Sequence, residues 1–245
     1  MKKLGILGGT GPQSTAEYYL RIVYGFQKRH PENLFPEFVL NSVNNVEMLR
    51  LAAQPELDDM VDFMVERVAM LEQAGCDIGI LAANTSHLVF HEVQEEVNIE
   101  LISIVDTAAD ACIAKGIKRP VLFGTSFTMN AGFYPKTFSE NGLDILIPEG
   151  SERQFVHDKY MSELVHGEVR PDTKAALSAI AKGLKEAHGA DALILGGTEL
   201  SLMFKESDAD ELGMPVIDTT QVHVDAAIDA MLGVRKKTRP KSRLE

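Results

Sequence analysis

The chain has 245 residues, 45% of them hydrophobic and 24% charged, so it can bury a substantial core and has the composition of a globular protein. Its formal net charge is −12, and the last eleven positions hold six basic residues and one acidic residue, which leaves −17 on the rest of the chain. An acidic body argues against nucleic acid as a partner, and the lack of any run of about 18 apolar residues argues against a transmembrane helix.

Short apolar runs alternate with longer amphipathic segments along the whole chain. The predicted strands are, in order, Leu4–Leu7, Phe38–Val43, Ile78–Leu81, Leu101–Val105, Val121–Phe123, Leu143–Ile147, Leu193–Leu195 and Val216–Ile217. The predicted helices are Ser14–Lys28, Glu56–Ala74, His87–Val97, Thr107–Lys115, Ala131–Glu140, Glu152–His166, Thr173–His188 and Gln221–Leu232. Asp172 or Thr173 is a plausible N-cap, and Gly75 and Gly189 each end a helix. Such alternation is typical of α/β proteins with parallel sheets flanked by helices.

An internal repeat divides this pattern into two parts. Residues 74–85 (AGCDIGILAANT) align without gaps on residues 188–199 (HGADALILGGTE), and residues 6–10 echo residues 122–126 at nearly the same offset. We therefore expect two pseudo-symmetric α/β halves, each with two turns of small residues at strand ends. Ligands of open parallel sheets bind beyond the carboxyl ends of the strands, so the repeat predicts one cleft with all four turns around it.

The four turns carry the polar groups that a ligand would meet. They are Gly8–Pro12, Ala82–His87, Gly124–Thr128 and Gly196–Glu199. The first resembles part of a dinucleotide-binding fingerprint, but Ser14 stands where the third glycine is required, so a carboxylate at the helix N-terminus fits better. Each turn alone can equally be a helix cap, whereas four in equivalent positions favour a shared anionic ligand.

The order and spacing of these turns resemble the signatures of the aspartate/glutamate racemase family. The similarity rests on Gly8–Pro12, Asn84–His87, Gly124-Thr125 with Thr128-Met129, and Gly197–Leu200, and it extends from about Lys3 to Leu232. It implies two flavodoxin-like lobes with the active site in the cleft between them. The first lobe would comprise about residues 1–104 plus 218–234, and the second about residues 105–217. It also implies amino-acid racemisation without PLP or any other cofactor or metal, and a homodimer. We expect residues 235–245 to form a basic, disordered tail.

In that family two facing acid/base cysteines, one from each lobe, move the α-proton, and the resemblance places them at Ala83 and Gly197. A methyl group and a hydrogen atom cannot transfer protons, so the two-thiol mechanism is not available here. Cysteine at both positions is expected to create or restore racemisation if the geometry of the cleft is intact. Cys76 and Cys112 are expected to be reduced, buried thiols of a cytoplasmic protein and do not replace the missing pair.

Other side chains are then needed for proton transfer. Glu199 and His87 are the first candidates, followed by His166 and His223, and their alternative role is to orient or cap the turns. Relatives with Lys at the position of His166 would bind a side-chain carboxylate there, which His can do only when protonated. The substrate-binding positions implied by the resemblance are Thr10, Asn84, Thr85, Thr125, Ser126, Thr128, His166 and Thr198.

Several functions stay open at this point. The family resemblance favours a racemase for a small or acidic amino acid. The lost cysteines favour a catalytically inactive protein that binds an amino acid or another small carboxylate, and a lyase on the same scaffold is a further alternative. Engineered replacement of the two acid/base residues to trap a ligand would also explain the presence of Ala83 and Gly197.

Overall fold

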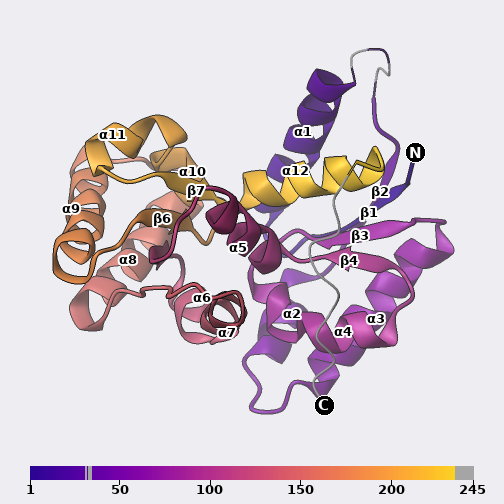
Figure 1. The fold of residues 1–245 in the computed structure, drawn as a ribbon. Helices are drawn as coiled ribbons and strands as arrows, with labels where there is room; N and C mark the ends of the chain where they lie inside the picture. The colour runs from indigo at the N-terminus through magenta and orange to yellow at the C-terminus, as the bar shows by residue number, and fades with distance from the viewer. Residues whose placement is uncertain (31, 33–34, 235–245) are drawn as a thin grey trace.

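The computed structural model describes residues 1–30, 32 and 35–234, which form two parallel sheets flanked by helices (Figure 1). The first sheet has the order β2-β1-β3-β4 and consists of β1 (Leu4–Gly8), β2 (Phe38–Ser42), β3 (Ile78–Leu81) and β4 (Glu100–Ile102). The second has the order β5-β6-β7 and consists of β5 (Pro120–Phe123), β6 (Ala192–Leu195) and β7 (Val216–Asp218). The predicted α/β fold with two parallel sheets is confirmed. We call the two sheets with their surrounding helices the first and second halves.

The helices follow the strands as the alternating pattern predicts. They are α1 (Pro12–Arg29), α2 (Asn45–Ala52), α3 (Asp58–Gln73), α4 (Phe90–Glu96), α5 (Ile104–Ala114), α6 (Ser126–Asn130), α7 (Phe133–Glu140), α8 (Gly150–Ser162), α9 (Pro171–His188), α10 (Leu200–Met203), α11 (Ala209–Leu212) and α12 (Thr219–Met231). In the described part of the chain, none of them has the length and apolar character needed to cross a membrane. The predicted tail, residues 235–245, lies outside the described residues.

The two halves repeat each other in detail. The Asp77 carboxylate accepts a hydrogen bond of 2.7 Å from the backbone N–H of Lys3, just before β1. The Asp191 carboxylate does the same for Lys118, just before β5, at 2.6 Å. Each aspartate thus fixes the entry of the neighbouring strand, which explains why the aligned repeat contains it.

Three predicted boundaries are wrong for identifiable reasons. The strand predicted over Leu101–Val105 ends at Ile102, because the Ser103 side chain caps α5 by accepting from the Asp106 N–H. The segment 143–147 forms only an isolated bridge from Leu146 to Val121, beside β5. Helix α9 begins at Pro171 with Arg170 as its N-cap, since proline suits the first helical position and has no N–H that needs a partner.

Helices α5 and α12 tie the halves together by crossing between them. Helix α5 follows the last strand of the first sheet, yet its buried face, including Ile104 and Ala108, belongs to the core of the second half. Helix α12 follows the last strand of the second sheet, and its Val224 and Ile228 pack with Leu4 in the core of the first half. Figure 1 shows α12, in yellow, beside α1. The lobe boundaries predicted above stay a prediction.

Both cysteines are free and buried, as the sequence predicts. Cys76 lies just before β3, and Cys112 faces the core of the second half from α5. Burial, together with the charge of Asp191, raises the pKa of the Cys112 thiol to about 12. A thiol of this kind stays protonated at neutral pH and does not act as a base.

Candidate active site at the strand ends

Within each half, the two predicted turns lie next to each other. In the first half the Ser14 hydroxyl, at the start of α1, donates to the Ala82 carbonyl after β3 at 2.8 Å. In the second half the Gly196 N–H donates to the Phe123 carbonyl at 2.7 Å, which joins the ends of β5 and β6. Parallel strands end at one edge of their sheet, so each half presents a pair of turns there.

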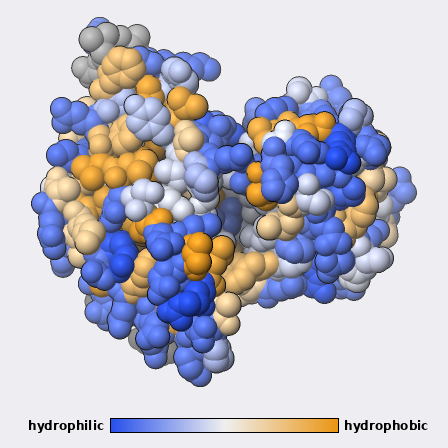
Figure 2. All heavy atoms as spheres, turned by 180° about the vertical axis from the view of Figure 1, so that it is seen from behind, coloured by the Kyte–Doolittle hydropathy of each residue, from blue (hydrophilic) through white to orange (hydrophobic). Residues whose placement is uncertain are grey.

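Contacts between the halves bring the two pairs of turns together. The Tyr134 hydroxyl of α7 donates to the Asn84 side-chain oxygen at 2.7 Å, and both residues are buried. Phe127 of α6 packs against the core of the first half. The space-filling view shows the surface indented between the two halves (Figure 2). These contacts place Asn84 of the second turn and Phe127 of the third turn at the junction of the two halves.

The first turn has the features of an anion site. Gly11 caps the 18-residue helix α1 without any side-chain hydrogen bond, and the first turn of α1 contains no acidic residue. The Thr10 hydroxyl oxygen is buried and has no partner among the described residues, a property it shares only with side-chain oxygens of Asn45 and Ser178. Buried polar atoms are normally hydrogen-bonded, so an oxygen-rich ligand would complete this turn.

The third turn is held by its own hydroxyls and by a residue that the sequence analysis missed. The Thr125 hydroxyl caps α6 by accepting from the Thr128 N–H at 3.2 Å. The Ser126 N–H donates to His157 Nδ1 at 3.1 Å, and His157 comes from α8. The Thr125 side chain thus has the capping role that was the alternative to ligand binding. No motif in the sequence marks His157.

The fourth turn contains the most informative feature of the site. The φ angle of Gly197 does not lie in the left-handed region, so its backbone would accept a larger residue. A Cβ atom there, however, would lie 2.4 Å from the hydroxyl oxygen and 2.6 Å from Cε2 of Tyr160. The tyrosine of α8 occupies the space that a side chain at position 197 requires. Cysteines at positions 83 and 197 can therefore restore racemisation only if Tyr160 moves, and that expectation stays a prediction.

Tyr160 is hydrogen-bonded to Glu199. Its hydroxyl donates to Glu199 Oε2, which also accepts from the Thr198 hydroxyl at 2.9 Å. Tyr160 is only 6% exposed, whereas Glu199 is half-buried. Burial, followed by the charge of Glu199, raises the pKa of Tyr160 well above its ordinary value, so the phenol keeps its proton at neutral pH.

The equivalent position in the first half, Ala83, offers no such group. Ala83 lies beyond β3 and is half-buried, and its carbonyl accepts from the Ser86 hydroxyl at 2.7 Å and from His87 Nδ1 at 2.9 Å. His87 Nε2 accepts from the Ile104 N–H at 3.0 Å. Both ring nitrogens of His87 are thus engaged, and the ring joins the end of β3 to the start of α5.

Burial, followed by the charge of the neighbouring His223, lowers the pKa of His87 to about 3. The His223 ring lies edge-on to His87 with centroids 6.0 Å apart. Its Nδ1 shares a hydrogen bond of 2.7 Å with the Tyr18 hydroxyl, and its Nε2 contacts the Ile102 carbonyl at 2.8 Å. Two buried, hydrogen-bonded rings in a core fit the structural role given above for both histidines better than proton transfer.

Two predicted site residues have less support in the local geometry. Thr85 is half-buried at the start of a 3-10 turn, Thr85–Val89. His166 is exposed at the end of another, Leu164–His166. Among the described residues, the His166 ring forms no hydrogen bond with the other predicted site residues. The described residues also contain no group of three or more His, Cys, Asp or Glu side chains that could hold a metal ion.

Two halves, each built on a parallel sheet with small-residue turns at its strand ends, define a two-lobed α/β protein. The sequence profile of the Asp/Glu/Hydantoin racemase family matches residues 7–227. The chain therefore belongs to this family.

Individual relatives agree with this assignment. The broad specificity amino-acid racemase RacX of Bacillus subtilis (strain 168) is 22% identical over 232 residues, which cover 94% of this chain and 98% of the relative. The crystal structure of an aspartate racemase homologue from Pyrococcus horikoshii OT3 is 32% identical, with a TM-score of 0.84 over 95% of this chain and 100% of that one. A candidate Asp/Glu racemase from Yersinia pestis, also a crystal structure, is 29% identical, with a TM-score of 0.87 over 95% of this chain and all of that one.

Proposed function

We propose that this chain is an enzyme of the racemase family that binds a small amino acid through its carboxylate and exchanges the α-proton on one face only, without inversion. The observation that carries the proposal is Tyr160, which fills the side-chain space of Gly197 and donates to Glu199. A phenol–carboxylate pair in this way takes the place of the second thiol, while Ala83 leaves the opposite face without an acid or a base. No cofactor takes part in the proposed reaction.

The carboxylate end of the substrate is assigned to the first turn. The uncapped N–H groups at the start of α1 point along the axis of a long helix, whose dipole favours a negative charge at that end. The unpartnered Thr10 hydroxyl supplies a further donor. Donors at this end also stabilise the charge that the carboxylate gains when the α-proton leaves.

Glu199 acts as the base in this proposal. Its carboxylate breaks the Cα–H bond and takes the proton, while the electron pair moves onto the substrate carboxylate. The hydrogen bonds from Tyr160 and Thr198 orient the carboxylate, and Tyr160 stays protonated throughout. Solvent exchange at Glu199 followed by return of a deuteron to the same face gives exchange with retention, because nothing at Ala83 can protonate the other face.

The test is to incubate single-enantiomer amino acids with the protein in deuterated water and to follow the α-proton by NMR and the configuration by chiral chromatography. We expect the α-proton signal to disappear without inversion. The Glu199→Gln variant should lose about 100-fold or more of that rate, as is usual for removal of a general base. Glu206→Gln, at an exposed glutamate of the same half, is the control and should keep it.

Each alternative function has its own outcome in this experiment. Inversion at a rate comparable to exchange would establish a two-faced racemase and contradict the one-sided mechanism. Release of carbon dioxide would support the lyase. Calorimetric binding of an amino acid or another small carboxylate without any exchange would support the inactive binding protein. The preference for an acidic amino acid, which depends on His166, is decided by comparing aspartate and glutamate with alanine.

We further propose that the protein is a cytoplasmic homodimer that associates through the first half. Strand β2 is an edge strand, and large apolar side chains around it are exposed, among them Tyr24 and Phe35, each 64% exposed, and Leu40 at 36%. Figure 2 shows apolar residues gathered on this half. Edge strands and large exposed apolar patches are typical association surfaces.

Light scattering coupled to size-exclusion chromatography is expected to give a dimer mass for the unmodified chain. Leu40→Lys should convert it to a monomer, since a charge on the edge strand opposes pairing. Val169→Lys, at a 45% exposed position of the second half, should leave the dimer intact. A dimer that persists in the Leu40→Lys variant would exclude this surface.

A further inference from the structure

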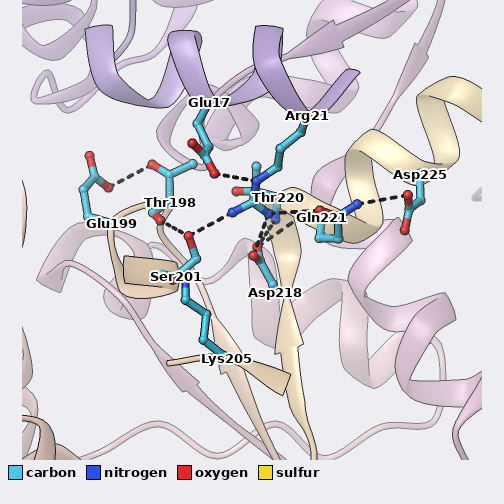
Figure 3. A network of polar contacts seen from close by, with 10 residues as sticks. All are labelled: Glu17, Arg21, Thr198, Glu199, Ser201, Lys205, Asp218, Thr220, Gln221 and Asp225. Carbon is cyan, nitrogen blue, oxygen red and sulfur yellow. Dashed lines mark hydrogen bonds and ion pairs between the residues drawn. The ribbon is translucent and has the colours of Figure 1, made fainter. Parts of the chain in front are cut away.

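A single arginine connects the first half to the turn that carries Glu199. Arg21 of α1 donates from Nη1 to Asp218 Oδ2 at 2.6 Å and from Nη2 to Ser201 Oγ at 2.9 Å (Figure 3). Asp218 ends β7, and Ser201 lies in α10, which follows β6. Its Nε donates to Glu17 on the same helix at 2.7 Å. The Arg21 side chain is only 16% exposed. Each nitrogen of the guanidinium thus has an acceptor, and two of the acceptors lie across the junction.

The contact with Ser201 reaches the backbone of the fourth turn. The Ser201 hydroxyl accepts from Arg21 and donates to the Thr198 carbonyl at 2.7 Å. The Thr198 hydroxyl in turn donates to Glu199. Lys205 holds the same short helix by donating to the Ser201 carbonyl. Figure 3 shows this continuous series of contacts from α1 to Glu199.

The contact with Asp218 fixes the start of α12 at the same point. Asp218 Oδ1 accepts from the N–H groups of Thr220 and Gln221 at 3.0 and 3.1 Å, and Oδ2 accepts from Arg21. The arginine therefore joins three elements, α1, α10 and α12, through one planar group. A lysine at this position carries the charge but has no fork with which to hold two acceptors in fixed directions.

We propose that Arg21 is a positioning residue that holds the fourth turn, and with it Glu199, in the orientation for proton transfer once the two halves meet. The proposal rests on the proposed role of Glu199 as the base. Arg21 acts through Ser201 and Thr198 and does not itself contact the substrate. Small misplacements of a catalytic group cost large factors in rate, so a residue of this kind affects turnover more than binding.

The chain offers a matched control for this arginine. Arg29 lies on the same helix α1 and also pairs with α12, through Asp225 at 2.6 Å and Asp229 at 2.7 Å. Those contacts remain among elements that pack on the first sheet, and none of them reaches the fourth turn. Arg29→Gln therefore removes a comparable ion pair between α1 and α12 and leaves the hydrogen bonds from Arg21 to Ser201 and Asp218 in place.

Two measurements on Arg21→Lys, Ser201→Ala and Arg29→Gln test the proposal. The first is hydrogen exchange of the amides of Leu200, Ser201 and Leu202, which close the fourth turn onto Gly197, Thr198 and Glu199 at 3.2, 3.2 and 3.0 Å. We expect faster exchange at these amides in the Arg21 and Ser201 variants and no change in the Arg29 variant. The second is the α-proton exchange reaction, in which kcat should fall about 10-fold or more in the first two variants with little change in KM.

The two measurements separate the failure of this proposal from the failure of the proposed function. If the unmodified protein shows no α-proton exchange, the function is wrong, and the amide measurement still decides whether Arg21 orders the turn. Unchanged amide exchange in both Arg21→Lys and Ser201→Ala overturns the positioning role. A loss of kcat in Arg29→Gln equal to that in Arg21→Lys also overturns it, because general weakening of the α1–α12 contact would then explain the effect.

Discussion

Replacement of Gly197 by alanine is expected to destabilise the protein by about 1–3 kcal/mol, the usual cost of overpacking a filled space. The added methyl group would lie 2.4 Å from the hydroxyl oxygen of Tyr160. The aromatic ring is rigid and cannot deform to make room, so the whole side chain has to shift. Tyr160 must then move, and its hydrogen bond to Glu199 is lost with it. Urea denaturation of the variant and of the unmodified chain measures the free-energy difference.

The cause of this effect is tested by a double-mutant cycle. In a Tyr160→Ala background, Gly197→Ala should cost much less than in the unmodified chain, because the space is then empty. Gly183→Ala is the control: Gly183 lies in α9 with nothing within 4 Å of an added Cβ, so alanine there should stabilise by about 0.5–1 kcal/mol. Additive effects of the two substitutions at positions 160 and 197 would refute the proposed steric exclusion. Any attempt to rebuild the thiol pair must for the same reason remove Tyr160 as well.

Much of the fold could be predicted because it depends on local patterns. The strands β3 and β6 are short buried runs, each preceded by an aspartate and followed by small residues, and the repeat of this pattern identified Ala83 and Gly197 as equivalent positions. The predicted strand over 143–147 failed because Leu146 is followed closely by Pro148, which cannot donate to a ladder, so only one bridge forms.

The content of the site could not be predicted from those patterns. Tyr160 reaches Gly197 from a helix that shares no motif or spacing with the fourth turn, and only the packing of α8 brings the two together. Arg21 similarly carries no mark in the sequence that distinguishes it from Arg29 on the same helix. Side chains that act across elements distant in the chain are set by tertiary packing, which one sequence does not disclose.

Acidification is expected to destabilise the protein through His87. Its pKa is about 3 in the folded state and about 6.5 in an unfolded chain, so protonation favours the unfolded state as pH falls through this interval. The contribution of neutral His87 is fully present above pH 6.5 and decreases by about 1.4 kcal/mol per pH unit, roughly 4 kcal/mol in all near pH 3. Denaturation midpoints measured between pH 7 and pH 3.5 give the slope.

The variant His87→Gln separates this effect from the carboxylates that also titrate in acid. A glutamine amide can donate to the Ala83 carbonyl and accept from the Ile104 N–H, but it takes up no proton in this range. Its stability should therefore be lower at pH 7 and depend less steeply on pH. His91→Gln, at an exposed histidine of the same helix region, should keep the slope of the unmodified chain. If the slope of His87→Gln equals that of the unmodified chain, His87 is not the group whose burial makes the fold sensitive to acid.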